Sequence, residues 1–167
     1  MQVRYWLIVL AGVLALSALP LFLDSEEQKI LNQLERLRGL AEVSAPLSNI
    51  QQLTRTREIA GYFREHTVYD LSNAGYGITE IHSRPELEQK ILGAFNRISS
   101  LEVSLEEAVV HIEDDTARVT VRGSALGSLR GEEGRFLDIH LVDVLFTKED
   151  DGWLVSGIRH LRDERQP

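Results

Sequence analysis

Residues 136–147 (FLDIHLVDVLFT) show the most informative hydrophobic pattern in the chain. Successive side chains of a strand point to opposite faces, and here both alternating sets are largely apolar. Before Thr147 at its end, the polar exceptions are Asp138, His140 and Asp143. The pattern predicts the central strand of a curved antiparallel sheet that is covered on both faces, with helices on the concave one.

A two-residue period runs from residue 101 to residue 161 and predicts three further strands. The expected strands and connections are strand 101–113 with a bulge or bend at Glu106-Glu107, turn 113–116, strand 117–125, glycine-rich loop 127–134, hairpin turn 148–152 and closing strand 153–161. Arg118, Thr120 and Arg122 are expected to face outward from the sheet.

Apolar side chains three and four residues apart predict three helices before the sheet. Their expected ranges are residues 24–43, about 47–66 and about 83–98. In the first helix, Ser25 can cap the N-terminus and the apolar face runs from Ile30 to Ala41. This face suits packing on the same domain, because a coiled coil of two heptads is too short to hold a dimer alone. The third helix begins with a capping box between Ser83 and Glu86.

The second helix has the least regular pattern. Its buried face is expected to carry Leu53, Thr56, Ala60 and Phe63. Its arginines, Arg55 among them, are expected in solvent. Before the third helix, the chain is expected to be irregular at residues 68–76 and to form a short strand at residues 77–82.

Residues 5–23 carry no charged side chain, and this length just suffices for a helix to cross a bilayer. Arg4 precedes the run, and acidic residues follow it from Asp24 onward. A positive residue before the span favours a cytoplasmic N-terminus. The pattern therefore predicts a signal anchor at residues 1–24 that crosses the inner (cytoplasmic) membrane once, with the C-terminal domain outside the cytoplasm.

Two alternatives compete with the anchor. The small-x-small pattern of Ala15-Leu16-Ser17 is typical of a cleaved signal peptide, although the apolar run continues past it. A buried core helix fits less well, because the run is uncharged on every side. With the anchor, the chain divides into the span at residues 1–24, a juxtamembrane helix at 25–45, an α+β domain at 46–161 and a charged tail at 162–167.

Composition narrows the function classes. The net charge of −8 argues against nucleic-acid binding, which needs a basic face. The absence of cysteine excludes structural disulfides and thiolate metal sites. The five histidines lack the i, i+4 and His-x-His spacings of zinc sites, and the glycine-rich residues 127–134 join two strands. No metal, phosphate loop or cofactor is therefore predicted.

The last strands contain two recognisable motifs, residues 114–123 (DDTARVTVRG) and residues 141–156 (LVDVLFTKEDDGWLVS). With the order of elements, these motifs resemble the nuclear transport factor 2-like (SnoaL-like) superfamily over about residues 50–161. The resemblance implies an α+β fold in which helices wrap a strongly curved antiparallel sheet into a cone with one pocket. It also implies homodimers, often paired through the outer surface of the sheet. It indicates no single function, because this scaffold hosts isomerases, hydrolases, dehydratases, binding domains and assembly factors.

Asp138 and His140 carry the sharpest enzyme hypothesis. Because they are two residues apart on one strand, their side chains point to the same face, about 7 Å apart at the backbone. On a concave face, this carboxylate and imidazole can shuttle a proton or activate a water. Tyr69, with Tyr62 and Tyr76 as alternatives, can donate to a developing oxyanion, as in the steroid-isomerase relatives. The pocket is expected to be lined by Phe63, Phe95, Phe136, Val142 and Trp153.

The same two residues have a plainer explanation, which the sequence favours. Asp138 and His140 can pair with Arg118, Arg122 or Arg159 on an outer or dimer-facing surface. The first function hypothesis is therefore a membrane-tethered, non-catalytic domain that binds a protein partner or a small apolar ligand outside the cytoplasm. Its architecture is loosely similar to that of the inner-membrane scaffold proteins of type IV secretion. The alternative is a small-molecule isomerase or hydrolase that uses Asp138 and His140.

Overall fold

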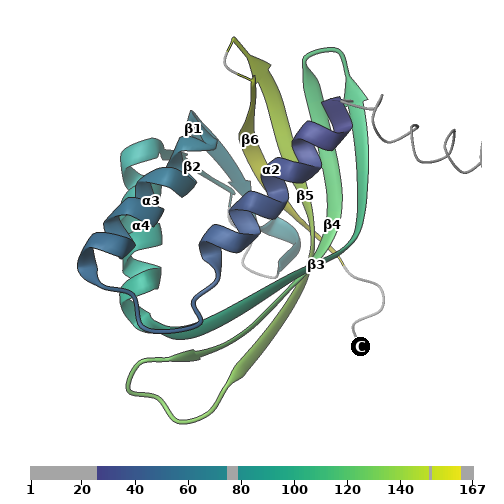
Figure 1. Ribbon diagram of the computed structural model, residues 1–167. Coiled ribbons are helices and arrows are strands. Elements are labelled where there is room, and N and C mark those ends of the chain that lie inside the picture. Colours follow the sequence, from purple (N-terminus) through teal and green to yellow (C-terminus); the bar gives the residue numbers. More distant parts are fainter. Residues whose placement is uncertain (1–25, 75–78, 151, 163–167) are drawn as a thin grey trace, which may run out of the picture.

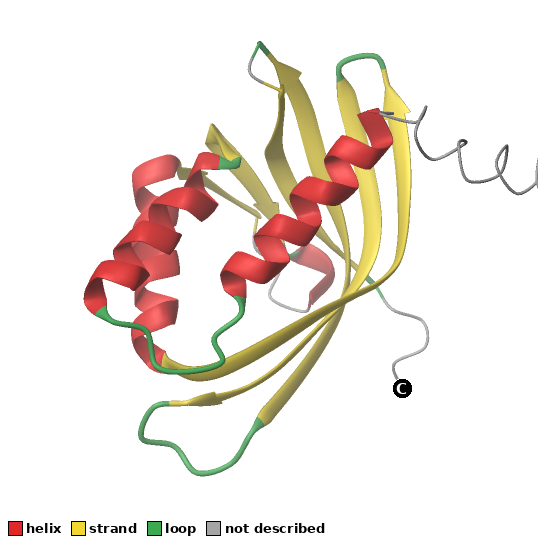
Figure 2. Cartoon of the chain, viewed as in Figure 1, coloured by secondary structure: helices red, strands yellow, loops and turns green. Residues whose placement is uncertain are grey.

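A strongly curved sheet and a layer of helices on its concave side make up the described part of the chain (Figure 1, Figure 2). The computed structural model describes residues 26–74, 79–150 and 152–162. In chain order the elements are α2 (Glu26–Ala41), α3 (Asn49–Gly61), β1 (Phe63–Asp70), the 3-10 turn η2 (Ser72–Ala74), β2 (Thr79–Ser83), α4 (Arg84–Arg97), β3 (Ile98–Glu113), β4 (Thr116–Leu129), β5 (Phe136–Glu149) and β6 (Gly152–Leu161). The predicted α+β class and curved sheet are confirmed.

The predicted membrane anchor at residues 5–23 lies outside the described residues, as do the Ser25 cap and Tyr76. Among the helices that are described, none combines the length and the apolar character needed to cross a bilayer. The anchor and the topology derived from it therefore stay predictions.

The sheet has the strand order β2-β1-β6-β5-β4-β3. Strands β3 to β6 form the predicted antiparallel meander. Strand β6 does not close the sheet, however, because β1 pairs with it in parallel and β2 pairs with β1. Strand β1 is where the sequence interpretation was wrong: α3 ends at Gly61, and the stretch expected to be helix and then irregular chain is strand. Pairing with β6 satisfies its backbone and overrides the weak helical pattern.

The core lies between the inner, concave face of the sheet and the helices. Its buried apolar side chains include Ile30 and Leu34 from α2, Ile59 from α3, Leu87 and Phe95 from α4, Val119 and Val121 from β4, Val144 and Phe146 from β5, and Trp153 and Val155 from β6. Helix α3 is rotated slightly relative to the expectation, because Gln52 is buried while Leu53 is 44% exposed. Thr56 and Ala60 are buried as predicted. The inward apolar face predicted for the first helix is confirmed at Ile30 and Leu34.

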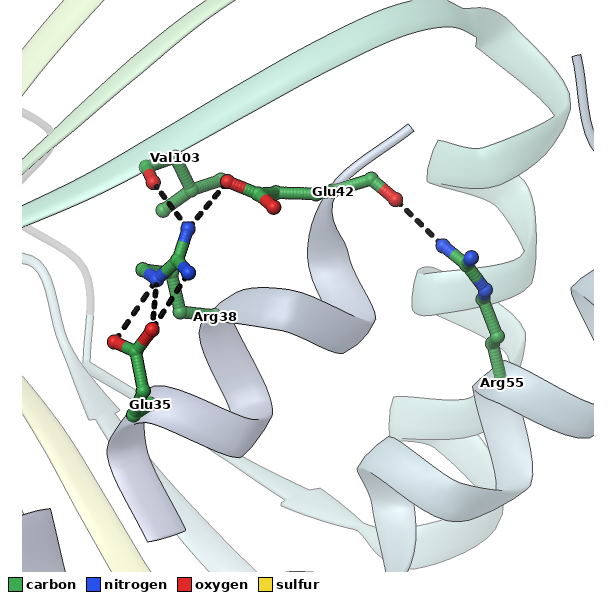
Figure 3. Close-up of polar contacts among 5 residues, drawn as sticks. All are labelled: Glu35, Arg38, Glu42, Arg55 and Val103. Atoms are coloured by element: carbon green, nitrogen blue, oxygen red, sulfur yellow. Dashed lines mark hydrogen bonds and ion pairs between the residues drawn. The ribbon is translucent and has the colours of Figure 1, made fainter. Parts of the chain in front are cut away.

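Polar contacts hold the C-terminal half of α2 against the edge of the sheet (Figure 3). Arg38 forms ion pairs with Glu35, at 2.6 Å, and with Glu42. Its Nη1 also donates to the backbone oxygen of Val103, 3.1 Å away in the edge strand β3. A charged side chain thus occupies an acceptor that an edge strand would otherwise leave open to another chain.

Arg55 on α3 completes this attachment. It was expected in solvent, but its Nη1 donates to the backbone oxygen of Glu42 at 2.5 Å and to that of Leu40 at 3.4 Å. Leu40 lies in the last turn of α2 and Glu42 comes directly after the helix, where the backbone acceptors have no partner within the helix. The next residue, Val43, exchanges two backbone hydrogen bonds with Leu101 of β3, at 2.9 and 2.8 Å. Helix α2 is therefore part of the domain.

The N-terminal turn of α2 is held at the opposite end. Glu26 accepts hydrogen bonds from Trp153 Nε1 at 2.6 Å and from Lys29 at 3.1 Å, and it pairs with Lys148 at 3.2 Å. The indole hydrogen bond is the largest of the causes that lower the pKa of Glu26 to about 2. Glu26 therefore stays ionised over the whole physiological range, and its contact with β6 is independent of pH there.

Candidate functional site

Asp138 and His140 lie on the inner face of the sheet. In the pairing of β5 with β4, His140 is opposite Gly123, and Val142 is opposite the buried Val121. Residues opposite each other in an antiparallel pair share a face, and so do residues two apart on one strand. The two polar side chains therefore continue the row of core side chains along β5, toward the end where that row meets solvent.

The arginines that were expected as partners lie on the other face. Arg118 and Arg122 alternate with the inward-facing residues of β4, as predicted. Arg159 is opposite Asp143 and pairs with Asp70 Oδ2 at 3.4 Å. The explanation of Asp138 and His140 as rungs of an outer, arginine-paired surface does not fit this arrangement.

Instead, Asp138 and His140 form a continuous hydrogen-bonded chain with a second histidine. Asp138 Oδ1 lies 2.8 Å from His140 Nε2, and His140 Nδ1 lies 2.9 Å from His160 Nε2. The two imidazole rings meet edge to face, with their centroids 4.9 Å apart. The sequence interpretation missed His160, because it considered the histidines one by one along the chain.

A single extra residue in β6 brings His160 to the inner face. Near the hairpin, Phe146 is opposite Val155, but Leu145 is opposite Gly157, so Ser156 has no opposite residue. This bulge shifts the register by one position, and His160 comes to lie opposite Val142. With an unbroken register, His160 would face outward, away from His140.

The solvent exposure of the side chains falls along the hydrogen-bonded series Asp138–His140–His160. The side chains of Asp138 and His140 are 61% and 46% exposed. His160 is half-buried, and its Nδ1 is buried without a hydrogen-bond partner among the described residues. Burial is the main reason why the pKa of His160 is lowered; the neighbouring His140 lowers it further, and the Asp138 carboxylate partly opposes this. His160 is therefore a neutral base at physiological pH.

Tyr69 contributes a second unpartnered polar group to the same face. It lies on β1 opposite Ile158, which in turn is opposite the buried Val144. Its hydroxyl is buried and has no hydrogen-bond partner among the described residues, and its ring contacts that of His82 at a centroid distance of 5.1 Å. Burial raises the pKa of Tyr69 to about 12, so the hydroxyl keeps its proton.

The other residues predicted at the site fall into two groups. Phe63, Phe95 and Trp153 are buried in the core, whereas Phe136 and Val142 are half-buried on β5. Trp153 also lines a cleft of about 430 Å³ beside α2, together with Tyr62 and Lys148. That cleft does not include Asp138, His140 or His160, so Tyr62 is not placed beside these three residues.

The arrangement is suited to proton transfer. Within the described ranges, no group of three side chains has the geometry of a metal site, and the ring nitrogens of His140 are engaged with Asp138 and His160. Two polar atoms on the neighbouring strands β6 and β1, His160 Nδ1 and the Tyr69 hydroxyl, are buried and have no hydrogen-bond partner among the described residues. One can accept a proton, and the other can donate a hydrogen bond.

Comparison with known proteins identifies the fold. No protein-family model matches the chain, and no curated protein matches it in sequence. Kfla4162 from Kribbella flavida aligns over 81% of this chain and 88% of its own, with a TM-score of 0.65 and 17% identity. A nuclear transport factor 2-like superfamily protein from Salmonella enterica serovar Typhimurium aligns over 85% and 94%, with a TM-score of 0.63 and 10% identity. A candidate scytalone dehydratase from Novosphingobium aromaticivorans aligns over 81% and 85%, with a TM-score of 0.61 and 12% identity.

Identities this low support a conclusion about architecture only. The curled sheet with helices on its concave side is the nuclear transport factor 2-like fold, as the sequence motifs implied. The fold hosts both enzymes and binding domains, so the function has to be argued from the site.

Proposed function

We propose that this domain acts on a small organic molecule at the inner face of its sheet and moves a proton between two positions of that molecule. The observation that supports the proposal is the hydrogen-bonded chain from Asp138 through His140 to His160. The proposed reaction class is isomerisation or dehydration. In either case the proton that leaves one atom returns to the product or departs with water, so the reaction needs no cofactor.

Each side chain has a role that its surroundings support. The histidines would handle the proton, and Asp138 would hold His140 in one orientation. The Tyr69 hydroxyl would donate a hydrogen bond to an oxygen that becomes negative as the proton leaves. A small ketone with an acidic hydrogen on the carbon beside the carbonyl offers both the proton that leaves and the oxygen that becomes negative. A β-hydroxy ketone carries in addition a hydroxyl group that can leave as water. The dehydratase name of one structural neighbour is consistent with this class.

The test is turnover of a panel of small ketones and β-hydroxy ketones, followed by proton NMR. Replacing His140 by Phe should lower turnover by about 10²- to 10⁴-fold, the usual contribution of general acid–base catalysis. The matched control is His111→Phe. His111 also pairs with a carboxylate two residues away, Glu113 at 2.9 Å, but it lies on the outer face. Equal effects of the two substitutions, or no turnover of any compound, would refute the proposal.

A membrane-tethered binding domain is the second candidate, and a different observation favours it. Residues 5–23 are uncharged, and the outer face of the sheet exposes large apolar side chains: Val68 at 39%, Ile81 at 65%, Val109 at 65% and Leu137 at 63%. A second copy of the chain is the expected occupant of that face, as the family resemblance implies. Membrane fractionation tests the tether, and sedimentation of the full chain beside Leu137→Lys tests the pairing. A protein recovered in the soluble fraction as a monomer would count against this candidate.

A further inference from the structure

A further cleft, of about 510 Å³, lies where α2 is attached to the rest of the domain. It is formed by the end of α2 and its connection to α3, the middle of α3, the first residues of β3, and the end of β4 with the connection to β5. Its volume is within the range of small-molecule sites, about 300–1,000 Å³. The charged and hydroxyl-bearing residues of its lining are Glu42, Ser44, Arg55, Ser100, Glu102 and Arg135.

Arg55 brings a positive charge to this cleft without a counter-charge. Its side chain is half-buried, and its Nη1 donates to two backbone oxygens, those of Leu40 and Glu42 (Figure 3). No carboxylate in the described ranges forms an ion pair with it. Neutral carbonyl groups satisfy hydrogen bonds but leave the charge uncompensated, and burying an unpaired charge costs free energy.

The other edge of this guanidinium is available to a ligand. Its Nε and Nη2 make no hydrogen bond with a described residue, and neither atom is shielded from solvent. This pair of nitrogens can donate two parallel hydrogen bonds to one carboxylate. Arg55 therefore offers a carboxylate site that is reached from the cleft.

The remaining charges of the lining decide which carboxylate fits. Arg135, which is exposed and comes just before β5, has no acidic partner among the described residues. Glu42 is taken by Arg38. Glu102 has no cationic partner in the part of the chain that the structure describes. The uncompensated charges are thus two guanidinium groups and one carboxylate.

We propose that this cleft binds an acidic α-amino acid, whose two carboxylates and one ammonium group match these charges one for one. Arg55 takes one carboxylate through Nε and Nη2, Arg135 takes the other, and Glu102 takes the ammonium group. The cleft does not include Asp138, His140 or His160, so this site is independent of the proposed reaction.

Three probes separate the charges of the ligand. Glutarate is glutamate without the ammonium group, and glutamine is glutamate without the second carboxylate. Each is titrated into the full-length protein labelled with ¹⁵N, and the backbone amide signals of Val43 and Leu101 are followed by NMR, because these two residues line the cleft. Glutamate should shift both signals in a saturable way and should bind more tightly than either analogue.

Substitutions assign each charge to a residue. Arg55→Lys keeps the charge but loses the paired donors, and should weaken glutamate binding roughly tenfold, the worth of one charged hydrogen bond. Arg135→Gln should weaken it by about 2- to 5-fold, as for an exposed ion pair, and should abolish the preference over glutamine. Glu102→Gln should abolish the preference over glutarate. Arg57→Gln is the matched control, because Arg57 is exposed on α3 and does not line the cleft.

The test does not depend on the variant at Arg55, which also holds the end of α2. Arg135 makes no contact with a described residue, so Arg135→Gln should fold as the wild type does. The absence of a saturable shift with glutamate would overturn the proposal. So would wild-type preferences in both Arg135→Gln and Glu102→Gln, or an equal loss of affinity in Arg135→Gln and Arg57→Gln.

Discussion

Substitution of Gly127 by alanine tests how closely strands β3, β4 and β5 pack together near Asp138. Gly127 lies in β4 on the inner face, opposite Phe136. A methyl group built there would lie 2.5 Å from the backbone oxygen of Ser100 and 2.8 Å from Cζ of Phe136. Gly123, four residues earlier on the same face, offers a control, because a methyl group there would meet only Leu105 Cδ2, at 3.9 Å.

The magnitude follows from these distances. A carbon–oxygen contact is comfortable at about 3.3–3.6 Å, so a methyl group 2.5 Å from the Ser100 oxygen would force the backbone of β3 to move by about 1 Å. Overpacking of this kind costs about 1–3 kcal/mol. Gly123→Ala has no such cost and gains roughly 0.5–1 kcal/mol, because alanine loses less backbone entropy than glycine on folding. The free energies of unfolding of the two variants should therefore differ by about 1.5–4 kcal/mol.

Urea denaturation of both variants, followed by far-UV circular dichroism, measures the difference. Gly127→Ala should be less stable than the wild type, and Gly123→Ala should be equal to it or more stable. If both alanine variants are equally stable, the conclusion that Ser100 and Phe136 closely approach Gly127 is wrong.

Two further predictions concern α2. Ile30 is fully buried, so Ile30→Ala should lower the free energy of unfolding by about 2–5 kcal/mol. The control Glu27→Ala, at an exposed position, should change it by less than about 0.5 kcal/mol. Equal effects would mean that α2 does not pack on the sheet. Because the pKa of Glu26 is lowered from 4.5 to about 2, its contribution to stability is fully present above pH 4.5 and is lost as the pH falls toward 2. Denaturation curves of Glu26→Gln between those pH values should lack this loss, and an unchanged pH dependence would contradict the contact with Trp153.

Elements specified by local chemistry could be predicted from the sequence. The capping box at the start of α4 forms as expected, with the backbone nitrogen of Ser83 donating to Glu86 Oε2 at 2.8 Å. The bulge expected at Glu106-Glu107 is present, since the register of β3 shifts there and Glu107 has a φ of 54°. Strand β1 could not be predicted in this way, because its partner β6 is far away in the sequence and supplies the pairing that decides between strand and helix.

The site was predictable only in part for a similar reason. Asp138 and His140 could be assigned to one face from their spacing on β5, but the choice of face depended on the curvature of the whole sheet. His160 joins them through the unpaired Ser156, and nothing in the local sequence of β6 marks that residue as a bulge. A one-residue uncertainty in register reverses every side chain beyond it, so the second histidine emerges only once the strands are paired.

Deuterium uptake is the most direct test of proton transfer at the inner face. The full-length protein is incubated in D₂O with small ketones, and deuterium at the carbon beside the carbonyl is followed by NMR. The account predicts uptake that is faster with the wild type and His111→Phe than with His160→Phe, by about 10²-fold or more. Uptake at the same rate with all three proteins, or none above the background without protein, would contradict it.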